Sequence, residues 1–217
     1  ATTHSDLGTL LKPVNVTYYC RKHFKICKPL FSINKWFKVY SSDTIKRLKK
    51  FKELRTDAYQ ICITGDARNI DIFESVKNLS EKKNFYKLLK KQKISGIFTS
   101  PPYIGLIDYH EQHAYAYDLF KIGRNDNLEI GSLSKGQSAT AKLSYIEDIA
   151  KVLNNAKKYM KDDYNVFIVA NDKYDLYPKI AELSGMKIVN KFKRPVLNRV
   201  EKDKSAYSEI IFHLKEL

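Results

Sequence analysis

The sequence is poor in the residues that mark disulfide scaffolds, linkers and membrane spans. Its three cysteines, Cys20, Cys27 and Cys62, are odd in number and too few for a disulfide framework, which fits a reducing cytosol. No apolar run approaches the length of about 18 residues that marks a spanning helix. The first residues also lack the apolar segment of a secretory signal. The lack of such a run excludes a spanning helix, nothing in the first residues suggests secretion, and we expect a soluble protein.

The chain also lacks internal repeats, proline-rich linkers and Gly/Ser-rich tracts, so a second independent domain is not expected. A hydrophobic fraction of 43% in 217 residues is enough for one substantial core and excludes a wholly disordered chain. Residues 1–42 follow no clean hydrophobic period. We expect them to form an N-terminal arm that packs on the core or on a missing partner segment, and residues 43–217 to form the main α/β domain.

Basic residues outnumber acidic residues, 39 against 24, which gives a net charge of +15. A positive field of this size favours a polyanionic partner, although charge alone says nothing about the fold. A merely soluble basic surface is the alternative interpretation.

Apolar segments with β-rich composition alternate with helical patterns along the chain. A helix is expected from Asp43, a good N-cap, to Leu54. Strands are expected at residues 58–64, 94–99, 165–170, 186–192 and 208–214. This alternation predicts an α/β fold with a mostly parallel sheet, helices on both faces and an antiparallel last strand, because the loop before that strand is too short for a covering helix.

The segment Thr99-Ser100-Pro101-Pro102-Tyr103 follows a predicted strand. The carboxyl end of a parallel strand is where open α/β sheets bind ligands. The prolines favour extended backbone and lack donors, which leaves carbonyl acceptors. A Ser hydroxyl and a Pro carbonyl can accept hydrogen bonds from the exocyclic amine of a base, and Tyr103 can stack on a base rotated out of a duplex.

This motif resembles the catalytic Ser/Asp-Pro-Pro-Tyr motif of S-adenosylmethionine-dependent DNA amino-methyltransferases, and the string Phe98–His113 is similar to a prokaryotic site-specific branch of them. The resemblance runs from about Gly65 to the C-terminus. It implies a Rossmann-like methyltransferase sheet, a cytoplasmic prokaryotic protein and a role in DNA methylation, for instance in restriction–modification. Ser100 in place of Asp favours N4 of cytosine over N6 of adenine. Ser100, Pro101, Pro102 and Tyr103 are the implied catalytic residues.

The same resemblance assigns three residues to the methyl donor. Asp66, at the end of the first predicted strand, matches the acid that accepts a hydrogen bond from the adenine amine of S-adenosylmethionine, with Ala67 and Thr99 beside it. The alternative for Asp66 is a cap on the following helix. Asn171 and Asp172, after a later strand, either line the cleft or cap a helix.

A basic polar loop joins the last two predicted strands. Its position near the expected cleft favours contacts to phosphates, although a solvated hairpin loop is the alternative. The candidate nucleic-acid-binding residues are Arg194, Asn198, Arg199, Lys202 and Lys204. We interpret residues 123–136 as part of a target-recognition segment.

Cys20, His23 and Cys27 have zinc-ligand types at a plausible spacing, but a structural zinc site needs four ligands. His4 or Cys62 could supply the fourth ligand. We expect no metal, with Cys20 and Cys27 as ordinary buried thiols, and bound zinc is the alternative.

The Gly-rich turn with which the family binds its donor is missing from the sequence. We expect it on an upstream segment or a second polypeptide, so this chain would be the target-base half of the enzyme, acting on double-stranded DNA. The neighbouring alternative is an N6-adenine or RNA base methyltransferase. A non-catalytic basic DNA-binding subunit with a degenerate methyltransferase fold is the alternative of another class.

Overall fold

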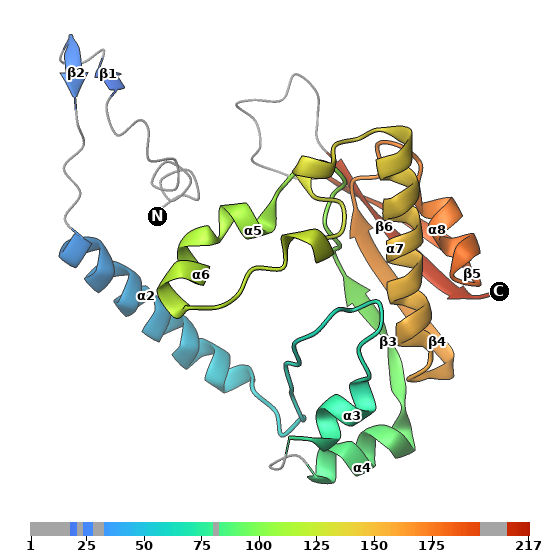
Figure 1. Cartoon of the computed structure of the whole chain (residues 1–217). Coiled ribbons are helices and arrows are strands. Elements are labelled where there is room, and N and C mark those ends of the chain that lie inside the picture. Colours follow the sequence, from blue (N-terminus) through green and yellow to red (C-terminus); the bar gives the residue numbers. More distant parts are fainter. Residues whose placement is uncertain (1–17, 21–23, 28–32, 80–82, 196–207) are drawn as a thin grey trace. The chain divides into compact units, whose positions relative to one another are not determined.

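The computed structural model describes residues 18–20, 24–27, 33–79, 83–195 and 208–217 (Figure 1). The chain divides into two compact units, Ala1–Gln60 and Ile61–Leu217. The first unit contains a hairpin of β1 (Tyr18–Cys20) and β2 (Lys25–Cys27), followed by the long helix α2 (Ile33–Leu54). The expected division after residue 42 therefore falls inside a helix, and the organisation into an arm and one main domain stays a prediction.

The expected start of this helix at Asp43 is wrong, because α2 begins at Ile33. Asp43 lies inside the helix, where its carboxylate accepts from Arg47 Nε at 2.7 Å. The helical period continues upstream of Asp43 through Trp36 and Tyr40, which fall on the face of Phe51 at intervals of three and four residues. Trp36 and Phe37, which fall in the arm expected over residues 1–42, therefore lie in the first turns of the helix.

The second unit is built on a four-stranded sheet in the order β3-β4-β6-β5. Its strands are β3 (Ile94–Thr99), β4 (Met160–Ala170), β5 (Met186–Pro195) and β6 (Ser208–Glu216). β3 pairs parallel with β4, whereas β6 pairs antiparallel with both β4 and β5. β3, β4 and β5 therefore run in one direction and β6 runs in the other. This confirms the expected mixed sheet, in which most strands are parallel and the last strand is antiparallel.

Two helices, α7 (Ala139–Lys157) and α8 (Tyr177–Leu183), lie together on one face of this sheet (Figure 1). Ser138 caps α7 by accepting from the amide of Ala141 at 3.1 Å. Apolar residues of both helices share one core with the inward residues of the central strands. The largest fully buried side chains of this core include Ile168, Ile180, Phe212 and Leu214. Burial of each such side chain stabilises the fold by about 1.5–3 kcal/mol.

The opposite face of the sheet does not carry the helices expected there, within the described residues. Phe98 on β3 is 77% exposed and Phe192 on β5 is 50% exposed. Between them, Phe167 and His213 stack at 4.4 Å across β4 and β6. The prediction of helices on both faces therefore fails for the part of the chain that the structure describes, and an aromatic face remains open.

The expected strand at residues 58–64 is not formed. These residues have no regular secondary structure. A β-strand is stabilised by a paired neighbour, and the only sheet partner of β3 among the described residues is β4. Local β-propensity of this segment is not enough without such a neighbour.

Four short helices connect these elements: α3 (Ile72–Lys77), α4 (Lys83–Gln92), α5 (Tyr109–Gln112) and α6 (Ala114–Phe120). Helices α5 and α6 meet at His113, which is the C-cap of the first and the N-cap of the second. Single 3-10 turns follow at Asp126–Leu128 and Leu133–Lys135. Among the described helices, none combines the length and apolar character needed to cross a bilayer.

Gly96 fixes the approach of β3 to β4. A Cβ atom on Gly96 would lie 2.0 Å from the backbone oxygen of Asn165, where no side chain fits. The register of the parallel pair shifts between Ile94 and Gly96, and from Gly96 to Thr99 it is regular. The close approach of the two strands at this position therefore requires glycine.

Candidate functional site

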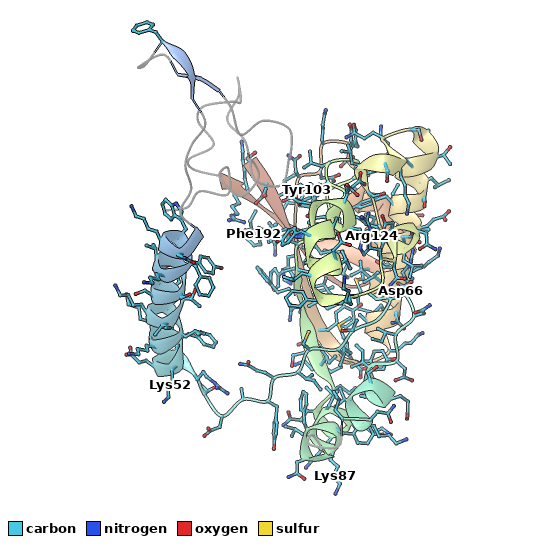
Figure 2. All side chains as sticks on the ribbon, turned by 60° about the vertical axis from the view of Figure 1, so that its left-hand side comes forward. Lys52, Asp66, Lys87, Tyr103, Arg124 and Phe192 are labelled. Atoms are coloured by element: carbon cyan, nitrogen blue, oxygen red, sulfur yellow. The ribbon has the colours of Figure 1, made fainter. Side chains whose placement is uncertain are left out.

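The Thr-Ser-Pro-Pro-Tyr segment lies at the carboxyl end of β3. Thr99 is the last residue of the strand, and Ser100 follows it with an exposed side chain. The prolines and Tyr103 are half-buried, and Tyr103 packs against the core (Figure 2). The structure thus places the segment at the strand end where open α/β sheets bind ligands.

Helix α7 holds this segment through one buried hydroxyl. Tyr145 Oη donates to the carbonyl of Pro102 at 2.8 Å and lies 3.0 Å from Tyr177 Oη on α8. Burial raises the pKa of Tyr145 to about 12, so the phenol stays protonated and remains a donor. The Pro102 carbonyl is therefore already occupied. Within the described residues, no hydrogen bond engages the Ser100 hydroxyl or the Pro101 carbonyl, so both can accept one.

Tyr103 is held from the other side, by the antiparallel strand β6. Its hydroxyl donates to Glu209 Oε1 at 2.6 Å, and Glu209 Oε2 accepts from Arg194 Nη1 at 3.0 Å. Arg194 and Glu209 are directly paired across β5 and β6. The sequence interpretation missed Glu209. The available signal was an acid near the start of the last expected strand.

Arg194, a predicted nucleic-acid contact, is thus joined to the motif through Glu209. Its side chain is 55% exposed, whereas that of Glu209 is 13% exposed. The remaining predicted contacts, Asn198, Arg199, Lys202 and Lys204, lie outside the described residues.

Asp66 lies in a turn rather than at a strand end. Its Oδ2 accepts from Arg68 Nη2 at 2.7 Å, and its Oδ1 accepts from the amide of Arg68 at 3.0 Å. The side-chain hydrogen bond from Arg68 holds the pKa of Asp66 below its usual value, so the carboxylate is ionised at neutral pH. The N-cap of α3 is Asp71, so the alternative of Asp66 as a cap is wrong. Its role toward the methyl donor stays a prediction, as do those of Ala67 and Thr99.

The turn that contains Asp66 is fastened to α7. Arg68 Nη1 pairs with Asp148 at 3.1 Å, and Asn155 Nδ2 donates to the carbonyls of Ala67 at 3.2 Å and Ile70 at 2.9 Å. Tyr145, which holds the Pro102 carbonyl, lies three residues before Asp148, which is about one helical turn. One helix therefore fixes both the Pro-Pro segment and the Asp66 turn, on neighbouring turns.

Asp172 follows β4 and lies four residues before Leu176, the N-cap residue of α8. Its carboxylate accepts from the amides of Leu176 at 2.7 Å and Tyr177 at 3.3 Å, at the start of α8. Burial raises the pKa of Asp172, and the two amide bonds oppose that shift. Of the two interpretations left open for Asp172, the helix cap is the one that the geometry supports.

The segment after the motif is bound to the loop at residues 123–136. Gly105 N donates to the Gly131 carbonyl at 2.8 Å, and Asp108 Oδ1 accepts from the amide of Ser134 at 3.0 Å. Arg124 pairs with Asp126 and, at 3.1 Å, with Glu111 on α5. The loop is therefore an ordered neighbour of the motif, and its part in target recognition stays a prediction.

No group of three or more potential metal ligands occurs among the residues that the structure describes. Cys20 and Cys27 fall on β1 and β2, whereas His23 lies outside the described residues. Cys62 is an exposed free thiol.

A mixed α/β sheet with Ser-Pro-Pro-Tyr at the carboxyl end of a parallel strand is consistent with a methyltransferase-like fold. No family model matches the chain. The chain is 53% identical over 214 residues to the Type II methyltransferase M.MjaII of Methanocaldococcus jannaschii. The match covers 99% of this chain but 40% of the relative, so the chain spans less than half the length of the protein it resembles.

Proposed function

We propose that this chain is the target-base half of an S-adenosylmethionine-dependent DNA methyltransferase that modifies N4 of a flipped-out cytosine. The observation that carries the proposal is the pair of acceptors at Ser100 and Pro101, beside a Tyr103 ring that is held in place by Glu209. The similarity to a methyltransferase supports the reaction type. Ser100 in the first motif position favours cytosine, through the family resemblance.

The chain's own residues would prepare the amine of the base. Its lone pair is delocalised into the ring, which makes it a weak nucleophile. Hydrogen bonds to the Ser100 hydroxyl and the Pro101 carbonyl favour a tetrahedral nitrogen, whose lone pair is no longer delocalised into the ring and can point at the methyl donor. Tyr103 would stack on the base and keep it out of the duplex. The donor, when bound, supplies an electrophilic methyl group to that lone pair.

The residues present do not by themselves make a donor site. The Asp66 carboxylate, the expected acceptor for the donor's adenine amine, is engaged by the guanidinium and the amide of Arg68. The sequence also has no Gly-rich turn that would let the protein backbone closely approach the methionine part of the donor. We therefore propose that a second polypeptide, or a further part of the same protein, completes the site beside Asp66, Ala67 and Thr99. The coverage of only 40% of the relative supports this division.

DNA contacts would come from two basic regions. Helix α2 carries lysines on the face opposite its aromatic residues, with Lys38, Lys46 and Lys49 exposed on it. The second region is Arg194 with Asn198, Arg199, Lys202 and Lys204. Basic side chains bind phosphates without regard to sequence and position a protein on the duplex.

A methylation assay tests the proposal. The chain is incubated with DNA and donor, first alone and then with a polypeptide that carries the Gly-rich element, and the modified nucleosides are identified by mass spectrometry. We expect N4-methylcytosine from the reconstituted pair only. A product methylated at N6 of adenine, or in RNA, would establish the neighbouring alternative. DNA binding without any methyl transfer would establish the non-catalytic subunit.

Ser100→Ala should lower the rate of methyl transfer in this assay by about 100-fold while donor affinity stays unchanged, because the variant cannot make a hydrogen bond that forms in the transition state. An equal loss of donor affinity would contradict the role proposed for Ser100.

A further inference from the structure

Hydrogen bonds from Tyr103 and Arg194 to Glu209 connect the two edges of the four-stranded sheet. Tyr103 follows β3 at one edge of the sheet, while Arg194 lies on β5 at the other edge. Glu209, on β6 between them, has one carboxylate oxygen on each partner, at 2.6 Å to the Tyr103 hydroxyl and 3.0 Å to Arg194. A phenol–carboxylate bond of this length is charge-assisted and stronger than a bond between neutral groups.

The geometry points to Glu209 as a positioning residue for Tyr103, an inference that rests on the proposed function. The Glu209 side chain is largely buried, and a carboxylate in such a place is stable only when its oxygens are satisfied. Arg194 satisfies one oxygen and balances the charge. The other oxygen, Oε1, is thereby fixed and accepts from the Tyr103 hydroxyl, while the Tyr103 side chain packs against the core.

The effect of this arrangement would be on the orientation of the ring. A tyrosine ring held only at Cβ turns about two side-chain bonds. A bond at its hydroxyl fixes the direction of the ring axis, and because the phenolic O–H lies in the plane of the ring, a directed hydrogen bond also favours one ring plane. Stacking on a flipped base is strongest when the plane is preformed, because no ordering cost is then added on binding. Glu209 therefore acts through Tyr103 and does not itself touch the base.

The same arrangement predicts how substitutions combine. Tyr103→Phe removes the hydroxyl, and Glu209→Gln removes the charge that strengthens the bond, so each should lower kcat by about tenfold. Because both remove one interaction, the double variant should be no slower than the slower single variant. KM for the methyl donor should stay unchanged in all three, since none of these groups faces it in the proposed reaction.

The first experiment measures the bond without any turnover. The protein is labelled with ¹³C at tyrosine Cζ, and the Tyr103 signal is assigned by its absence from the spectrum of Tyr103→Phe. Glu209→Gln should shift this signal, whereas Glu216→Gln, a matched change further along β6 where the acid pairs with Lys157 at 2.8 Å, should leave it in place. An unshifted Tyr103 signal in Glu209→Gln would overturn the inference, whether or not the protein is a methyltransferase.

The second experiment uses the complete, active methyltransferase and DNA with a fluorescent cytosine analogue at the target position. Stacking on Tyr103 should quench the flipped analogue, and Glu209→Gln should relieve this quenching and lower kcat, with Glu216→Gln unaffected. A lower kcat without any change in quenching would refute a positioning role. Absence of methyl transfer by the wild-type protein would refute the proposed function instead, and the NMR result would stand apart from it.

Discussion

Helices α2 and α7 are of similar length, 22 and 19 residues, but they differ in what their apolar sides contact. α7 buries Tyr145, Ile149 and Leu153 against the sheet and also makes the polar bonds that hold the motif. On α2, Phe37, Leu48 and Phe51 are each more than half exposed. The period of apolar residues is helical in both. What makes one helix part of a core is the surface it meets, and the pattern alone does not reveal that surface.

The same substitution in the two helices should give the largest difference. Leu153→Ala on α7 should lower the free energy of unfolding by about 3 kcal/mol, because Leu153 is 2% exposed and a cavity remains. Leu48→Ala on α2 should cost less than about 0.5 kcal/mol, since Leu48 is 59% exposed. Urea unfolding of both variants measures the contrast. A large cost for Leu48→Ala in a longer protein, with none in this chain, would mean that the additional sequence covers α2.

The ion pairs of the two regions should differ by a smaller amount. Arg68→Met leaves Asp66 and Asp148 without their shared partner and should cost about 1–2 kcal/mol, because all three side chains are at most 20% exposed. Arg47→Met breaks a pair on α2 whose side chains are 80% and 55% exposed, and should cost less than about 0.5 kcal/mol. Equal costs would mean that the Asp66 turn is not fixed by Arg68.

The pair at Asp66 also has a defined pH dependence. The pKa of Asp66 is lowered in the fold, so its stabilisation is complete above the unfolded pKa of about 4 and is lost as the pH falls through the lower folded pKa. Arg68→Met should flatten this part of the acid unfolding curve, while Arg47→Met should leave it unchanged.

Changes on the basic side of α2 should affect folding least and DNA binding most. Lys46→Gln with Lys49→Gln should leave the free energy of unfolding within about 0.5 kcal/mol of the parent, because both side chains are exposed. The slope of log affinity for duplex DNA against log salt should become shallower by about 0.9 for each phosphate that the protein no longer neutralises. Lys161→Gln with Lys187→Gln, at the opposite end of the strands from Thr99, removes the same charge and serves as control. An equal change of slope in the control would show that only net charge matters.

The sequence predicted the second unit well where local pattern and burial agree. The apolar segments that became β3, β4 and β6 were found, as was the position of Ser100–Tyr103 at a strand end. The predicted strand at residues 58–64 was wrong because pairing depends on a neighbour that no local pattern specifies. The bonds from Tyr145 and Glu209 to the motif span 43 and 106 residues, so they become visible only in the folded chain.

Among the described residues, β3 pairs with a strand on one side only, so hydrogen exchange can detect a further strand that docks on its other side. In a parallel ladder, alternate amides of a strand point to opposite neighbours. Amides of β3 that bond to β4 should exchange slowly with deuterated solvent, whereas those on its other edge should exchange fast while no strand pairs there. Slowing of that second set would mark the moment when a further strand docks beside the Pro-Pro segment. Hydrogen exchange on six residues, Ile94–Thr99, would then report assembly before any methyl group is transferred.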